Sequence, residues 1–226
     1  MHIKEAGMTV QKSLIFLVDD HPLVREWLTN LINQQPDLIV CGEADDGPKA
    51  LQEISRVQPQ VAIVDISLKS SSGLELIKDL TRVSPELAVI VLSMHDELLY
   101  AERVFRAGAR GYVMKRESTQ KMVEAIRCVL DGKRYMSGRV AAAMAERLVD
   151  GHNVDTSPIM LLSDRELEVF ELLGQARETS QIAESLHISM KTVQSFCARI
   201  KEKLNINTER ELLREAVQWQ ENRHKR

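Results

Sequence analysis

Short, unbroken apolar runs alternate with amphipathic segments along the first 132 residues of the chain. A short apolar run is typical of a strand that is buried on both faces of a parallel sheet. The segments between the runs repeat apolar residues every three or four positions, which indicates helices. Pro22 occupies a favoured first-turn position of the first helix, and Ser118 is expected to cap the last one. The expected strands are Leu14 to Val18, Leu38 to Cys41, Val61 to Val64, Ala88 to Leu92, and Gly111 to Met114. The pattern predicts an α/β fold, a five-stranded parallel sheet doubly wound by helices.

The pattern changes after Gly132 and contains no further strand. "GRVAAAMAERLVD" is typical of a helix, and "DGHNVDTSP", from Asp150 to Pro158, is typical of a turn-rich linker. Ser163 and Glu166 then form a predicted capping box. The expected helices follow that box, run through "SQIAESL", extend from Ser189 to about Leu204, and extend from Thr208 to Trp219. We therefore expect an α/β domain at 12–132, a linker with a helix at 133–160, and a small all-α four-helix domain at 161–220.

Composition places the chain among ordinary globular proteins that need no membrane anchor. It has 226 residues, of which 44% are hydrophobic and 28% are charged. Its longest apolar runs are far shorter than the roughly 18 residues that span a bilayer, and the first residues lack the apolar core of a signal peptide. The three cysteines are scattered, which argues against a disulfide framework and favours the cytoplasm. The charges balance beyond residue 161, so any nucleic-acid contact must come from local clustering.

Polar side chains follow the apolar strands at the points where the strands end. Asp19 and Asp20 follow the first strand, Asp65 the third, Ser93 the fourth and Lys115 the fifth. Ligands of an open α/β sheet bind beyond the carboxyl ends of its strands, so these groups should converge. Three neighbouring carboxylates repel one another unless a cation lies among them, and an all-oxygen cluster suits Mg²⁺. With a hydroxyl and a lysine, the cluster has the parts needed for phosphoryl transfer onto aspartate.

Four motifs resemble the receiver domain of bacterial two-component response regulators, which has a flavodoxin-like fold. They are "VDD", "VDISLKSSSGLEL", "VLSMHD" and "GARGYVMKR". The resemblance implies that Asp65 is the phosphoacceptor, that Ser93 and Tyr112 form a switch pair, and that Lys115 completes the site. Asp19, Asp20, Asp65 and the backbone carbonyl of Ser67 are implied as the Mg²⁺ ligands. The chain has Lys69 and Arg116 where the family often has proline.

The C-terminal segment reads as a helix-turn-helix, with a short turn at "HIS". In its second helix the apolar residues recur at three and four positions, and they are Val193, Phe196, Cys197, Ile200 and Leu204. The residues left on the outside, which we expect to contact DNA, are Lys191, Thr192, Gln194, Ser195, Ala198, Arg199, Lys201 and Lys203. Four of these residues are basic, and phosphate contacts supply much of the affinity for DNA.

"LSDRELEVFELL", "IAESLHISMKTV" and "IKEKL" resemble the LuxR-type DNA-binding domain, so the whole chain resembles the NarL/FixJ family of response regulators. The family usually has lysine near the start of the recognition helix where this chain has Gln194, which could read an adenine edge. The resemblance implies a regulator phosphorylated on Asp65 by a histidine kinase or a phosphotransfer protein. Phosphorylation would then alter the face formed by the fourth helix, fifth strand and fifth helix. That change would control dimerisation and binding to double-stranded DNA, with a homodimer on the DNA.

Two other functions fit parts of the same pattern. The helical tail could bind a protein instead of DNA, which would make the chain a phosphorylation-controlled adaptor. The aspartate nucleophile and its metal could also serve a phosphohydrolase, but the chain has no cap domain or separate acid/base residue, so we do not expect an enzyme. His21, beside the acidic pair, is interpreted as a helix-start residue rather than a metal ligand. The stimulus and the operator sequence cannot be read from the residues.

Overall fold

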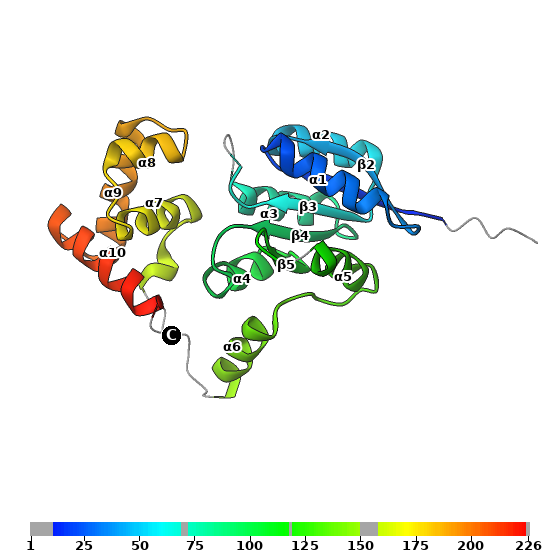
Figure 1. Cartoon of the computed structure of the whole chain (residues 1–226). Coiled ribbons are helices and arrows are strands. Elements are labelled where there is room, and N and C mark those ends of the chain that lie inside the picture. Colours follow the sequence, from blue (N-terminus) through cyan, green and yellow to red (C-terminus); the bar gives the residue numbers. More distant parts are fainter. Residues whose placement is uncertain (1–10, 69–71, 118, 150–157, 225–226) are drawn as a thin grey trace, which may run out of the picture. The chain divides into compact units, whose positions relative to one another are not determined.

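The computed structural model describes residues 11–68, 72–117, 119–149 and 158–224. The chain divides into two compact units between residues 146 and 147 (Figure 1). The cap expected at Ser118, residue Lys69 and most of the linker expected from Asp150 to Pro158 lie outside the described residues. In the part of the chain that is described, no helix combines the length and apolar character needed to cross a membrane.

The N-terminal unit contains the predicted five-stranded parallel sheet, with strand order β2-β1-β3-β4-β5. The strands are β1 Ser13–Val18, β2 Leu38–Ala44, β3 Val61–Asp65, β4 Ala88–Ser93 and β5 Gly111–Met114. The three central strands are buried along nearly their whole length, as their unbroken apolar runs predict. The edge strand β2 is half-exposed and continues to Ala44, three residues beyond the prediction.

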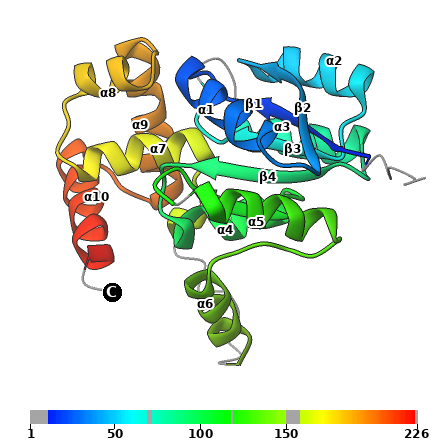
Figure 2. The ribbon, with the colours of Figure 1, turned by 45° about the vertical axis from the view of Figure 1, so that its right-hand side comes forward.

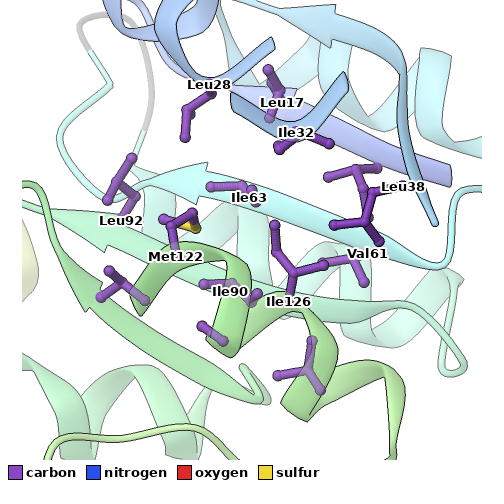
Figure 3. Close-up of a cluster of buried hydrophobic side chains, with 14 of the residues drawn as sticks. Leu17, Leu28, Ile32, Leu38, Val61, Ile63, Ile90, Leu92, Met122 and Ile126 are labelled. Atoms are coloured by element: carbon purple, nitrogen blue, oxygen red, sulfur yellow. The ribbon is translucent and has the colours of Figure 1, made fainter. Parts of the chain in front are cut away.

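Five helices cover the two faces of this sheet. They are α1 Pro22–Asn33, α2 Gly47–Val57, α3 Gly73–Val83, α4 Glu97–Arg106 and α5 Thr119–Leu130. Leu28 and Ile32 of α1 and Met122 and Ile126 of α5 pack against one face of the sheet, around Ile63 of β3 (Figure 3). Because side chains alternate along a strand, the remaining helices bury the other set of strand residues. With both faces covered, a site can form at the ends of the strands, and in sheets of this kind it lies beyond their carboxyl ends.

The segment that follows α5 returns to the sheet beside β5. Tyr135 forms a parallel bridge with Gly111, its backbone N–H donates to the Arg110 carbonyl (2.9 Å), and its carbonyl accepts from the Tyr112 N–H (3.1 Å). The guanidinium of Arg134 lies over the ring of Phe105 in α4, 5.8 Å from the ring centroid. The chain then enters α6 Gly138–Val149, the predicted alanine-rich helix (Figure 2). The connection thus begins as an addition to the sheet edge.

The C-terminal unit is entirely helical within its described residues. A short 3₁₀ turn, η1 Pro158–Leu161, precedes α7 Asp164–Gly174, α8 Thr179–Ser185, α9 Met190–Leu204 and α10 Glu209–His224. The predicted capping box is present, because Ser163 and Glu166 satisfy each other's backbone N–H groups. The ring of Phe170 in α7 packs against that of Trp219 in α10, with their centroids 5.5 Å apart. The four predicted helices therefore form one small packed unit.

Candidate functional site

Carboxylates gather at the carboxyl ends of β1 and β3. Asp19 follows β1 directly and Asp65 is the last residue of β3, and each is 2% exposed. Asp20 and His21 join them, so that one ligand atom from each of the four residues lies within 4.8 Å of the others. The aspartates converge, as the sequence predicts, because β1 and β3 are parallel neighbours and end at the same edge of the sheet.

Lys115 compensates part of this negative charge from the end of β5. Its Nζ lies 2.7 Å from Asp19 Oδ2 and 2.7 Å from Asp65 Oδ2, and its side chain is 12% exposed. Its backbone N–H donates to the carbonyl of Ser93, which fixes the base of the lysine against β4. Burial alone would lower the pKa of Lys115, but the two carboxylates raise it above its ordinary value. The ammonium is therefore charged and bridges the two strand ends.

The acidic cluster retains an excess of negative charge and fits a divalent cation. Three carboxylates face the single ammonium of Lys115. Burial raises the pKa of the Asp65 carboxyl, Lys115 opposes that rise, and the charge on Asp19 adds to it, so that the pKa stays above its ordinary value. Carboxylate oxygens at this spacing are ligands that hard cations prefer. The cluster is thus a candidate metal site by charge and by donor type.

The loop after Asp65 is held close to the strand end by a glycine. The backbone N–H of Ser67 donates to Asp65 Oδ1 (3.1 Å), and the N–H of Gly73 donates to the carbonyl of Ile66 (3.2 Å). A Cβ atom on Gly73 would lie 2.5 Å from the backbone oxygen of Asp65 and 2.6 Å from Cα of Ile66. Only glycine therefore permits the start of α3 to approach the aspartate so closely. This role of Gly73 was not predicted from the sequence.

Ser93 and Tyr112 are connected through His95, whose role the sequence did not reveal. Ser93 is fully buried at the end of β4, and its Oγ accepts from the backbone N–H of His95 (3.0 Å). Tyr112, in β5, is 2% exposed, and its hydroxyl donates to the carbonyl of His95 (3.0 Å). The imidazole Nε2 of His95 lies 2.9 Å from Ser67 Oγ. One residue thus links the loop after Asp65, the end of β4 and the middle of β5.

In the C-terminal unit, α8 and α9 form the predicted helix-turn-helix. His187 occupies the turn with a left-handed backbone (φ 53°), and the N–H of Ile188 donates to the carbonyl of Ala183. Val193 and Ile200 are fully buried, while the other members of the predicted apolar stripe of α9 are half-buried. The turn and the stripe together fix which side of α9 faces outward.

The structure separates the eight expected DNA contacts into three groups. The first group, Lys191, Gln194, Ser195, Ala198 and Arg199, is exposed on α9; Lys203 is also exposed, but an ion pair holds its ammonium. Thr192 and Lys201 are half-buried, and the Thr192 hydroxyl lies 2.8 Å from that of Ser189. Lys203 Nζ donates to Glu166 Oε2 (2.6 Å), which connects the end of α9 to the start of α7. The first group therefore forms the surface of α9 that is open to a ligand.

The chain is similar to known proteins over nearly its whole length. A model of the response regulator receiver domain matches residues 15–127, and one described as bacterial regulatory proteins of the luxR family matches residues 160–216. The oxygen regulatory protein NreC of Staphylococcus carnosus (strain TM300) is 32% identical over 208 residues, covering 90% of this chain and 96% of that protein. NreC of Staphylococcus aureus (strain JH9) shows the same identity and coverage.

Solved structures give the same result. RcsB from Salmonella enterica serovar Typhimurium, bound to promoter P1flhDC in the presence of the phosphomimetic BeF₃⁻, is 25% identical, with a TM-score of 0.59 over 91% of this chain and 98% of that chain. A LuxR-family two-component response regulator from Aurantimonas sp. SI85-9A1 is 33% identical, with a TM-score of 0.58 over 62% of this chain and 99% of that chain. The chain therefore belongs to the NarL/FixJ family of two-component response regulators, which are transcription factors and not catalytic enzymes, and it carries a receiver followed by a LuxR-type DNA-binding domain.

Proposed function

We propose that Asp65 accepts a phosphoryl group from a histidine kinase or a phosphotransfer protein. The contact that carries this proposal is the bridge from Lys115 Nζ to the carboxylates of Asp19 and Asp65, at 2.7 Å each. In the transfer, a carboxylate oxygen of Asp65 bonds to phosphorus while the phosphorus–nitrogen bond of the donor breaks, which leaves an acyl phosphate. Lys115 then neutralises charge on the transferred oxygens.

The residues that would hold a metal are Asp19, Asp20, Asp65 and the backbone carbonyl of Ser67. Mg²⁺ suits this oxygen-rich set, and it supplies positive charge beside the phosphoryl oxygens when it is bound. The N–H of Ser67 already donates to Asp65 Oδ1, which directs the loop toward the acceptor. The net negative charge of the cluster supports the same assignment.

The hydrogen bonds around His95 give a route from the acceptor to the face formed by α4, β5 and α5. Ser93 Oγ accepts from the N–H of His95, so its hydroxyl hydrogen can donate to a phosphoryl oxygen. A movement of Ser93 toward the phosphoryl group carries His95 with it, and Tyr112 is bonded to the carbonyl of His95. Phosphorylation therefore alters the packing of this face, which in turn controls dimerisation and DNA binding.

The output is binding of double-stranded DNA by α9, with a homodimer on the DNA. Lys191 and Arg199 are exposed to meet phosphates, and the exposed amide of Gln194 can pair with an adenine edge. RcsB, a relative whose structures include one of two dimers bound to two parallel DNAs, supports the proposal of a dimer on DNA. We place the protein in the cytoplasm, where such regulators typically bind DNA.

The test is phosphorylation by acetyl phosphate with Mg²⁺. We expect intact-mass spectrometry to show one added phosphoryl group on the wild type and none on Asp65→Asn. DNA affinity should rise on treatment of the wild type but not of Asp65→Asn, and it should weaken steeply with added salt. Asp79→Asn, a change at an exposed aspartate of α3 that pairs with Arg82, is the matched control and should behave as the wild type.

Equal mass gain in the wild type and in Asp65→Asn would overturn the assignment of the acceptor. Failure of every protein to bind DNA at low salt would favour the adaptor function over the DNA-binding function.

A further inference from the structure

Hydrogen bonds within α9 reduce the number of side chains that can recognise a base. The Ser195 hydroxyl donates to the backbone carbonyl of Lys191 (2.9 Å), so its hydrogen is used inside the helix and cannot be donated to a base. The Thr192 hydroxyl is half-buried and lies 2.8 Å from the hydroxyl of Ser189, the N-cap of the same helix. Base recognition therefore depends on the other exposed side chains of α9.

Gln194 and Ala198 project from the same side of α9. An α-helix turns by about 100° per residue, so side chains four positions apart differ by only about 40° in direction. Both residues are exposed, and the Gln194 amide makes no hydrogen bond to any residue that the structure describes. Arg199 points about 100° away from Ala198 and about 140° away from Gln194. An amide and a methyl group thus share one exposed side of the helix, and the guanidinium lies on another.

We infer that the DNA half-site has a core of A·T pairs, in which Gln194 recognises an adenine and Ala198 contacts the methyl group of a thymine. This inference rests on the proposed function, which assigns DNA binding to α9. A glutamine amide pairs bidentately with N6 and N7 of adenine, and an alanine methyl packs against the thymine C5-methyl. Guanine is most often recognised by arginine, but Arg199 points away from these two residues. Lys191 keeps the phosphate contact proposed above.

The spacing of the two residues limits the spacing of the two bases. Gln194 and Ala198 are the fifth and ninth of the 15 residues of α9, and the N-terminal part of a recognition helix contacts base edges. Four residues of an α-helix rise about 6 Å, whereas successive base pairs of B-DNA are about 3.4 Å apart. The adenine and the thymine should therefore lie within about two base pairs of each other in every half-site.

The test selects duplexes from a random pool with the full chain, phosphorylated by acetyl phosphate. We expect every selected half-site to contain the adenine and the thymine at this spacing. Replacing that adenine by 7-deazaadenine removes the N7 acceptor and should weaken binding about fivefold. Replacing the thymine by uracil removes the methyl group and should weaken binding about threefold. Gln194→Ala should lose the sensitivity to 7-deazaadenine and keep the sensitivity to uracil.

Gln218→Ala is the matched control, because it removes an exposed glutamine amide from α10 instead of α9. It should select the same duplexes as the wild type and keep both sensitivities. Selected half-sites with a G·C core, or equal sensitivity of the wild type and Gln194→Ala to 7-deazaadenine, would overturn the inference and leave the proposed DNA binding intact. Selection of no duplex at low salt would overturn the proposed DNA binding, and with it this inference.

Discussion

Replacing Lys115 by methionine tests how the receiver tolerates its buried carboxylates. The ammonium lies 2.7 Å from an oxygen of Asp19 and from one of Asp65, whose side chains are 3% and 2% exposed. Methionine fills a similar volume without charge, so Lys115→Met leaves both carboxylates without this cation. We expect the N-terminal unit to be destabilised when no divalent cation is present.

The size of the effect follows from the burial of the three groups. Removing one partner of a buried ion pair costs about 3 to 5 kcal/mol, because the remaining charge is left uncompensated. Lys115 is 12% exposed, and water can reach the cluster from that side, so the lower end of the range applies. About 3 kcal/mol corresponds to a fall in Tm of roughly 6 to 12 °C for a unit of this size.

The assay is thermal unfolding of the N-terminal unit within the full chain, in EDTA and again with Mg²⁺. Mg²⁺ should restore about 2.7 kcal/mol when its concentration is 100 times its Kd, because it binds only the folded cluster. Lys121→Met is the matched control, since Lys121 pairs with Glu117 at the surface and its side chain is 48% exposed. We expect that control to change stability by less than about 1 kcal/mol in either buffer.

Two results would refute this reasoning. Equal stability of Lys115→Met and Lys121→Met in EDTA would show that the carboxylates do not need the ammonium. An equal gain in stability for wild type and Lys115→Met on going from EDTA to one fixed Mg²⁺ concentration would show that the metal does not relieve the same repulsion.

Three further predictions concern the acceptor loop, the switch residue and the C-terminal unit. Gly73→Ala places a Cβ 2.5 Å from the backbone oxygen of Asp65, so the loop must shift; phosphorylation by acetyl phosphate should slow markedly, and an unchanged rate would contradict the close approach. Tyr112→Phe removes the hydrogen bond to the His95 carbonyl and should cost about 1 kcal/mol in urea unfolding, with a larger loss pointing to a packing defect. Burial would raise the pKa of Glu166, but its hydrogen bonds to a lysine and a serine lower the pKa overall. Its pairing should therefore stabilise α7 fully at pH values above the pKa that Glu166 has in the unfolded chain, and this stabilisation should be lost as the pH falls through the pKa of the folded state. Unfolding curves of the wild type and Glu166→Gln should converge at low pH, and a constant difference would contradict this assignment.

The sheet and the position of the site could be predicted because they depend on side-chain type. Unbroken apolar runs mark β1, β3 and β4, and the rule that parallel strands end at one edge brings Asp19 and Asp65 together. The end of β2 was less predictable, because Gly42 and Glu43 interrupt the apolar pattern in a half-exposed edge strand. Its pairing with β1 continues past them to Ala44 through backbone hydrogen bonds.

The connections through His95 and Tyr135 could not be predicted, because backbone groups make them. The N–H and carbonyl of His95 bond to Ser93 and Tyr112, and those of Tyr135 bond to β5. Every residue other than proline carries the same backbone groups, so residue type gives no signal. The ion pair of Lys203 could not be predicted for another reason. Helix periodicity correctly places Lys203 on the outside of α9, but it gives no sign that its partner is Glu166, 37 positions away in the sequence.

The bridge between Tyr135 and Gly111 has a practical consequence for work on the isolated receiver. A fragment that stops at residue 132 would remove the segment paired with the outer edge of β5, and it would leave the Tyr112 N–H and the Arg110 carbonyl unpaired at that edge. Bare strands recruit other chains, so such a fragment should self-associate in a way that the intact protein does not. A fragment that continues through residue 146 keeps its own neighbour for β5, and any dimer it forms can be attributed to the receiver's helices.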